Sequence, residues 1–502
     1  MHRSRKLAAI FLAGASLLGF VVIGHGQSAN TAMPVEALDA GNKTERGAPE
    51  TTNIWPFVVW RAADAYTRPE KVSSAGPIFS VKQYPGLKVT AVRPVYARFD
   101  DSTLGEERDH LFYPFFNHKQ RGPNSNWDLL GLMYGERMEQ ADGSMLKRFE
   151  LWPIFWSYDT GKAESSYWAF MPFYGELKHR LFADNIKFAM FPFYLRVQTR
   201  DEVNTSMPWP FIQILSGPQS RGLSIWPFFG HTERTNKYDH FYALWPLIYD
   251  KKDDLDQPVP SRRFGVLPFY TRETGAGLKS ETYVWPFFGY TEESAPRKTY
   301  DETRYFWPFF VQGRGEEKSI NRWMPFYTHE TAKDYTKTWY LWPLLKQTAW
   351  ESDGLQVKRD QFLYFLWWDE RQTALRGNSD FFARKTHLWP LFSYWNNGAG
   401  TRQFQTLSPL EVFYPHNEVI REKYSPLFAL YRYDHRPQST THSVLWDMIS
   451  VENSGSEGVF QIGPLFELNR NGDHAYAELL KGFIGYGVED GTRKLKFLWT
   501  EW

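Results

Sequence analysis

The residue types that most often carry chemistry are present, but their spacing forms no known catalytic or metal-binding motif. The 13 histidines include no His-Glu-x-x-His pair, and His329-Glu330 is an isolated pair of neighbours. No nucleophile elbow, phosphate-binding loop or dinucleotide fingerprint occurs, since Gly485-Tyr486-Gly487 has no helix pattern after it. A chain without cysteine has neither a thiol nucleophile nor a thiolate metal ligand. We therefore expect no catalytic residue, no metal, no cofactor and no enzymatic activity.

An acidic stretch, Asp253-Asp254-Leu255-Asp256, is the nearest approach to a cation site. It lacks the glycine and the distal glutamate of an EF-hand loop, which favours a solvated turn over a Ca²⁺ site. Carboxylates are common in the other turns as well. An exported enzyme acting on polysaccharide is the weakest functional alternative, because nothing in the sequence selects one acid/base pair among them.

Aromatic side chains are the distinctive chemical resource of the sequence. Phe (40), Tyr (28) and Trp (22) make up 18% of the 502 residues, although the mean hydropathy is −0.51. Exposed Trp and Tyr rings stack on sugars and lie well at membrane interfaces. Six tryptophans share one position in a repeated motif: Trp226, Trp245, Trp285, Trp307, Trp342 and Trp389. We expect these tryptophans to be packing residues that recur because the fold repeats. The alternative is that they stack on a ligand or constrict the interior of a barrel.

The repeated motif is a bulky apolar residue, proline, Phe or Leu, and a further apolar residue. Clear copies are Trp226-Pro227-Phe228, Trp285-Pro286-Phe287 and Trp307-Pro308-Phe309. About 24 copies, degenerate ones included, follow at a mean period of about 19 residues, which leaves room for one strand of about 9–12 residues and one turn. Polar turn-forming residues separate the copies. The repeat predicts a single all-β domain over residues 51–502.

The two faces of such a strand carry different residues, because strand side chains alternate. Around Pro246, one face would carry Tyr242, Leu244, Pro246 and Ile248. Four apolar residues on one face cover roughly 20–27 Å, the height of the apolar band of an outer-membrane barrel. The sequence therefore predicts an all-β repeat of about 24 antiparallel strands, most simply closed as a transmembrane barrel of the outer-membrane type.

Proline is the objection to this barrel, since it cannot donate to a strand ladder and normally lies at edges, bulges or strand starts. A ring of bulges would bend every strand at one level. Alternatively, each repeat would contain two short strands that meet at the proline. That arrangement favours a soluble β-solenoid, sandwich or propeller.

The N-terminus predicts export. Residues 1–26 read as a signal peptide, with a basic start (Arg3, Arg5 and Lys6), an apolar core from Leu7 to Ile23, and small residues after it. Residues 27–50 are expected to be a flexible polar lead-in. A large exported chain without cysteine is typical of a bacterial envelope protein. We expect the outer membrane as its location, with the periplasm or the cell surface as alternatives.

These features indicate a bacterial outer-membrane protein that acts as a pore, a transporter or a surface scaffold, with the lipid bilayer as its partner. The aromatic C-terminus, Trp502, resembles the terminal strand signal of outer-membrane barrels, although Glu501 and Lys496 interrupt the usual apolar alternation. The alternative is a secreted or periplasmic all-β repeat protein that binds a glycan or an envelope protein through its aromatics. A net charge of +1 gives no general attraction to nucleic acid.

Overall fold

The all-β prediction is confirmed in the computed structural model, which describes residues 51–63, 69–375, 382–414, 417–472, 474–489 and 491–501. In these residues the chain forms 46 strands and two short helices. The expected signal peptide, 1–26, and the lead-in, 27–50, lie outside the described residues.

The strands run through the chain as follows. The first group is β1 Thr51–Ile54, β2 Val58–Arg61, β3 Glu70–Ser74, β4 Phe79–Tyr84, β5 Leu87–Val92, β6 Tyr96–Asp101, β7 Glu106–Leu111, β8 Phe116–Arg121, β9 Asn124–Leu129, β10 Met133–Glu139, β11 Met145–Leu151, β12 Phe155–Asp159, β13 Tyr167–Phe170, β14 Tyr174–Arg180 and β15 Ala183–Ala189. The second group is β16 Tyr194–Thr199, β17 Glu202–Ser206, β18 Ile212–Ser216, β19 Ser220–Ile225, β20 Phe229–Arg234, β21 Tyr238–Ala243, β22 Ile248–Asp253, β23 Ser261–Val266, β24 Tyr270–Gly275, β25 Leu278–Tyr283, β26 Phe288–Glu293, β27 Tyr300–Phe306, β28 Phe310–Gly315, β29 Ser319–Trp323, β30 Tyr327–Ala332 and β31 Tyr335–Tyr340. The third group is β32 Leu345–Ser352, β33 Leu355–Phe362, β34 Trp367–Ala374, β35 Phe382–Leu388, β36 Phe392–Asn396, β37 Arg402–Thr406, β38 Tyr431–Arg436, β39 Ser439–Val444, β40 Ile449–Ser454, β41 Glu457–Ile462, β42 Phe466–Asn471, β43 His474–Leu479, β44 Ile484–Glu489, β45 Thr492–Phe497 and β46 Thr500–Glu501.

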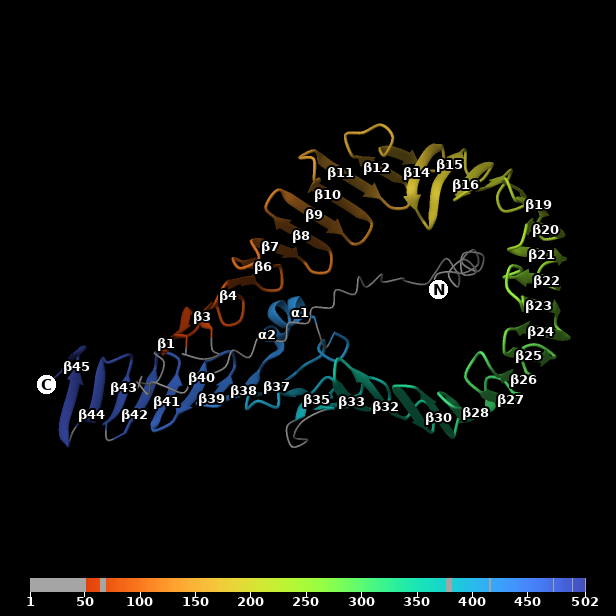
Figure 1. Ribbon diagram of the computed structural model, residues 1–502. Coiled ribbons are helices and arrows are strands. Elements are labelled where there is room, and N and C mark those ends of the chain that lie inside the picture. Colours follow the sequence, from red (N-terminus) through yellow and green to blue (C-terminus); the bar gives the residue numbers. More distant parts are fainter. Residues whose placement is uncertain are drawn as a thin grey trace. The chain divides into compact units, whose positions relative to one another are not determined.

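The sheet is an antiparallel meander in which each strand pairs with the next one along the chain (Figure 1). The first strand, β1, pairs with β2, and the last strand, β46, pairs with β45. Within the described residues no backbone pairing joins β1 to β46, so hydrogen bonds between strands do not close the sheet. A barrel and a solenoid both remain compatible with this pairing.

The prolines lie in turns between strands and not at mid-strand, which corrects the placement expected from the sequence. Pro227 lies between β19 and β20, and Pro246 lies between β21 and β22. Each repeat therefore contributes two short strands, and the number of strands is about twice the expected 24. The physical reason is that a turn does not need the backbone donor that proline lacks.

The proline turns are tight and are joined to one another. Phe228 N donates to Ile225 O at 2.8 Å across the cis Trp226–Pro227 peptide, which is the arrangement of a type VI turn. Trp245 N, in the next such turn, donates to Pro227 O at 2.7 Å. The strand ladder thus continues into the turns through these backbone hydrogen bonds.

Both helices lie between β37 and β38: α1 is Glu418–Lys423 and α2 is Ser425–Phe428. Asn417 caps α1, because its side chain accepts a hydrogen bond from Ile420 N at 3.0 Å. Val419 of α1 packs with Val89 of β5 and with Phe99 of β6 in a small buried cluster. A second buried cluster, with Trp156 and Phe188 among its members, covers β12 to β15.

Several glycines within strands are covered by the aromatic ring of the residue opposite. Gly230 pairs with Tyr242, and a Cβ at Gly230 would lie 2.1 Å from the tyrosine ring. Gly265 pairs with Tyr249 in the same way, with 2.4 Å to the ring. A ring that lies over a glycine in this way shields the backbone of the strand.

Candidate functional site

Every second turn of the meander lies at the same edge of the sheet, and this edge carries the proline motif. We call it the proline edge. Its turns in the regular part of the sheet are 112–115, 130–132, 152–154, 171–173, 190–193, 207–211, 226–228, 244–247, 267–269, 284–287, 307–309, 324–326, 341–344, 363–366 and 389–391. These turns contain no Asp, Glu, Lys or Arg. From residue 112 to residue 391 the edge is therefore an uncharged row along a highly charged sheet, whereas Arg93, Asp447 and Lys481 lie in its turns nearer the two ends of the sheet.

In several turns of the proline edge the residue after the proline is highly exposed. Phe228 is 64% exposed, Phe269 is 70% exposed and Phe326 is 67% exposed. Turns at the opposite edge are mostly polar, such as 235–237 and 294–299, although Phe182 there is 79% exposed. Large hydrophobic side chains are normally scattered on a protein surface, so a contiguous row of them marks an interaction surface.

All six candidate tryptophans lie in turns of the proline edge. Four of them are exposed: Trp226, Trp285, Trp307 and Trp342. The other two, Trp245 and Trp389, are half-buried. Among the described residues no ring contact joins any two of the six, because two or more strands separate their turns. They form a row, and whether any of them stacks on a ligand remains a prediction.

The packing of the two half-buried tryptophans agrees with a structural role for them. The Trp245 ring lies 5.8 Å from the Tyr242 ring and 6.3 Å from the Tyr249 ring, and Lys251 Nζ lies 5.1 Å from its centroid. Trp389 Nε1 donates to Pro409 O at 3.1 Å. Sequence reasoning selected the tryptophans and missed the phenylalanines that follow the prolines. Their regular recurrence in the motif was the signal that could have identified them.

The strands beyond the proline edge carry cross-strand ion pairs on both faces. On one face of β22, Lys252 Nζ lies 3.0 Å from Asp239. On the other face, Asp253 accepts from His240 at 2.7 Å and from Arg263 at 2.9 Å. Burial acts to raise the pKa of Asp253, but these two hydrogen bonds lower it to about 2, so its carboxylate is charged at neutral pH.

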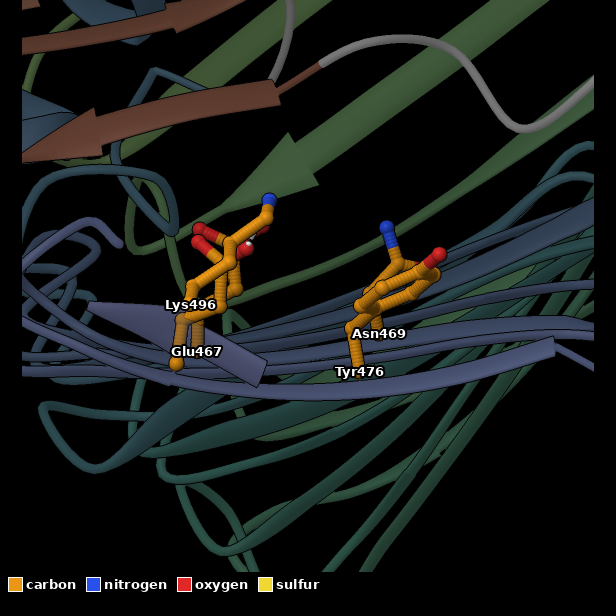
Figure 2. A pocket seen from close by; sticks show the side chains of 5 residues that line it. Glu467, Asn469, Tyr476 and Lys496 are labelled. Carbon is orange, nitrogen blue, oxygen red and sulfur yellow. Dashed lines mark hydrogen bonds and ion pairs between the residues drawn. The ribbon is translucent and has the colours of Figure 1, made fainter. Parts of the chain in front are cut away.

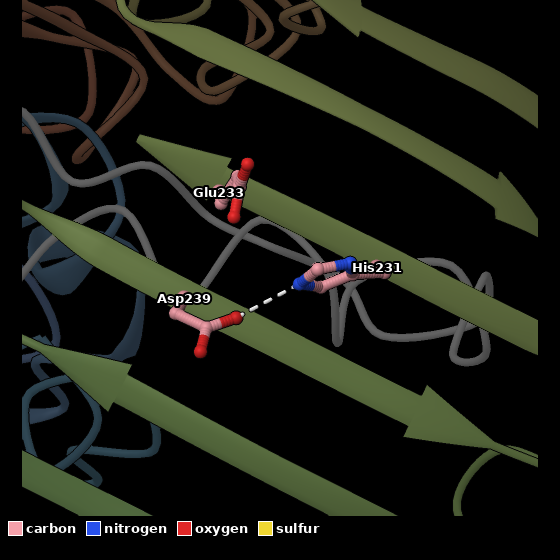
Figure 3. A group of neighbouring side chains, drawn as sticks. All are labelled: His231, Glu233 and Asp239. Atoms are coloured by element: carbon pink, nitrogen blue, oxygen red, sulfur yellow. Dashed lines mark hydrogen bonds and ion pairs between the residues drawn. The ribbon is translucent and has the colours of Figure 1, made fainter. Parts of the chain in front are cut away.

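One group in the described part of the chain has its atoms placed for a metal ion: His231, Glu233 and Asp239 (Figure 3). Their ligand atoms lie within 4.8 Å of one another, and His231 Nε2 is 3.0 Å from Asp239 Oδ1. Glu233 already accepts from Arg221, and Asp239 accepts from Lys252. Because both carboxylates have cationic partners, we assign no metal site to this group.

A shallow polar cavity of about 200 Å³ lies on β42 to β45 (Figure 2). It is lined by Glu467, Asn469, Tyr476, Glu478 and Lys496. Lys496 Nζ donates to Glu478 at 2.7 Å and lies 5.5 Å from the centroid of the Tyr476 ring. Its charges are compensated by neighbouring side chains, so the cavity offers little to attract a charged ligand.

Neither helix of the described residues has the length and apolar character needed to cross a bilayer. No protein-family model and no curated protein sequence matches the chain.

Proposed function

We propose that the protein is a bacterial envelope scaffold that docks on a lipid bilayer through its proline edge without spanning it. The observation that carries this proposal is the uncharged row of turns with their exposed Phe, Leu and Trp side chains. Aromatic residues are favoured where a membrane meets water. The apolar part of the side chain contacts lipid, while its other end remains in contact with water.

The expected strength of docking follows from the size of these side chains. Burying a Phe or Leu side chain is worth about 1.5–3 kcal/mol, and shallow insertion at an interface yields part of this. A single turn would bind weakly. The proline edge repeats its exposed side chain in successive turns, so several turns that insert together bind through the sum of their contributions.

A membrane-spanning pore or transporter, which the sequence suggested first, has less support. Transmembrane strands need about 9–11 residues, whereas the longest described strands, β32 to β34, have eight. Both faces of the strands also carry ion pairs, such as Lys252–Asp239 on one face of β22 and Arg263–Asp253 on the other. Charged groups at the level of the hydrocarbon core are expensive on the lipid-facing side of a barrel.

Co-sedimentation of the full chain with phospholipid vesicles tests the proposal. We expect the double variant Phe228→Glu with Phe269→Glu to reduce the vesicle-bound fraction at least tenfold, because each change places a charge at the proline edge. Phe182→Glu is the matched control, since this phenylalanine lies at the opposite edge and is even more exposed than Phe228 and Phe269. No binding by the original chain, or equal loss with the control, would overturn docking. Heat-modifiable gel mobility together with bilayer conductance would favour the spanning barrel instead.

A further inference from the structure

A groove of about 570 Å³ lies on β9 to β12 and has an aromatic floor. The Trp127 ring lies across Gly135 of the neighbouring strand, where a Cβ would be 2.3 Å from Trp127 Nε1. The Phe149 ring, from the strand on the other side of Gly135, lies 6.2 Å from the Trp127 ring. Glycine at position 135 thus allows the indole to lie flat and present its other face to the groove.

Two cationic side chains lie on the same face of the sheet as the aromatic floor formed by Trp127 and Phe149. Arg137 and Lys147 are directly opposite each other on β10 and β11, and both are exposed. Like charges in directly opposed positions destabilise a sheet. Within the described residues neither side chain forms an ion pair. By contrast, Arg148 on the other face of β11 forms an ion pair, with 2.6 Å between Arg148 Nε and Glu150 Oε1.

Among the described residues, the carboxylate of Asp159, which also lines the groove, forms no ion pair with either cation. Asp159 is opposite Lys147 in the register of β11 and β12. Its carboxylate instead accepts from Gly161 N at 2.9 Å and from Ser166 Oγ at 3.4 Å, so it holds the following turn. On this face of the groove, Arg137 and Lys147 carry two positive charges against the single negative charge of Asp159, so a positive excess is left beside the aromatic floor.

We propose that this groove binds an anionic saccharide, a pyranose ring that carries a carboxylate or a phosphate. The apolar face of the sugar stacks on Trp127, and the anionic group lies between Arg137 and Lys147. Ser125 and Ser157, which also line the groove, supply hydroxyls at its two sides. The proposal does not depend on membrane docking, because the groove lies on the face of the strands and the docking residues lie in the turns.

An anionic sugar of this kind occurs in two classes of envelope molecule. One is a polysaccharide that contains uronic acids, and the other is a glycolipid with a phosphorylated sugar. Titration calorimetry of the full chain with tetragalacturonate and with glucosamine 1-phosphate separates them. We expect at least one of the two to bind at least tenfold more tightly than neutral cellotetraose. Equal affinity for cellotetraose, or tighter binding of a single-stranded oligonucleotide, would overturn the assignment.

Substitutions locate the binding in the groove. We expect Arg137→Gln with Lys147→Gln to weaken the anionic ligand at least tenfold, and this surface change removes a repulsion without disturbing the fold. Trp127→Ala is expected to weaken it similarly, with circular dichroism checking that the sheet is intact. Arg314→Gln, an exposed arginine on β28, is the matched control. Unchanged affinity in the double glutamine variant would place the ligand elsewhere and refute the proposal.

Discussion

Arg61 and Asp447 form a buried ion pair, with 2.8 Å between Arg61 Nη2 and Asp447 Oδ1, although 386 positions separate them in the sequence. Asp447 lies in the turn between β39 and β40, and Arg61 ends β2. Lys71 Nζ lies 3.4 Å from the same carboxylate, and Asn53 Nδ2 donates to Asp447 O at 2.7 Å. These contacts join the first strands to later ones through side chains, where strand pairing does not.

Helix α1 makes a second set of contacts with the early strands. Lys82 Nζ donates to Glu422 at 2.6 Å, and Arg93 Nε donates to Glu422 O at 2.8 Å. Lys423 Nζ, fully buried, donates to His110 O at 3.2 Å. The helix lies in the connection between β37 and β38 and provides buried partners for the early strands.

The first prediction concerns the Arg61–Asp447 pair. Asp447→Asn should lower the free energy of unfolding by roughly 3 kcal/mol, because it leaves the Arg61 guanidinium buried without its charge partner. Urea denaturation measures the change. Asp256→Asn removes the carboxylate of an exposed ion pair and should leave the denaturation midpoint where it is. The same midpoint for Asp447→Asn and the original chain would show that the pair does not hold the fold.

The second prediction is a loss of stability in acid. Burial would raise the pKa of Asp447, but Arg61 and Lys71 hold it well below its usual range. Lys82 and Arg93 likewise lower the pKa of Glu422 to about 2, against the effect of burial. Ordinary carboxyl pKa values in unfolded chains are about 4. At a pH between the lowered pKa of the folded state and this ordinary value, the unfolded state therefore binds more protons than the folded state. The stability that these two carboxylates contribute should be constant above about pH 5 and fall as the pH drops toward 2.

Urea midpoints measured at pH 6 and pH 3 check this dependence. Asp447→Asn combined with Glu422→Gln removes both titrating groups, and its two midpoints should differ less than those of the original chain. An identical pH difference in the double variant would assign the acid sensitivity to other carboxylates.

The repeat and the all-β class could be predicted because the proline motif and the polar turns are local patterns. The position of the proline within each unit could not. An alternating apolar pattern such as Tyr242, Leu244, Pro246 and Ile248 is equally consistent with one long strand and with two short strands joined by an apolar turn. The absent backbone donor of proline decided between them, since a turn tolerates it and a ladder does not.

The groove and the buried ion pairs depend on which residues are opposed across strands. Gly135 appears as an isolated glycine in the sequence, and only the strand register places Trp127 over it. Arg137 and Lys147 are ten positions apart, yet they are direct neighbours in the sheet. Arg61 and Asp447 carry no local signal at all, because contacts between distant strands leave no periodic trace.

The third prediction tests the aromatic covers on the glycines. Gly230→Ala should destabilise the fold by about 1–3 kcal/mol, because the new methyl group collides with the Tyr242 ring. Adding Tyr242→Thr should restore part of the loss. Gly275→Ala is the control, since the nearest atom to a Cβ there is 3.7 Å away. Equal unfolding free energies for Gly230→Ala and Gly275→Ala would refute the close packing.

The fourth prediction separates the two proposed binding surfaces. Trp285→Ala with Trp342→Ala removes two exposed rings of the proline edge and should lower vesicle binding several-fold. The same variant should bind tetragalacturonate or glucosamine 1-phosphate as the original chain does. A loss of saccharide affinity would instead favour the row of tryptophans as a stacking surface for sugars. Vesicle sedimentation and titration calorimetry on the same preparation provide both readouts.

The fifth prediction uses the absence of cysteine, which lets a single introduced thiol carry an environment-sensitive dye. Phe269→Cys labels the proline edge, Phe182→Cys labels the opposite edge, and Thr271→Cys and Arg272→Cys label the two faces of β24. If the chain docks by its edge, vesicles should shift the emission of the dye at position 269 to shorter wavelength and leave that at position 182 unchanged. A strand that crosses the bilayer would also shift the dye at position 271 or 272, because one face of β24 would then contact lipid along its length. The pattern over the four sites therefore distinguishes shallow docking from spanning in a single experiment.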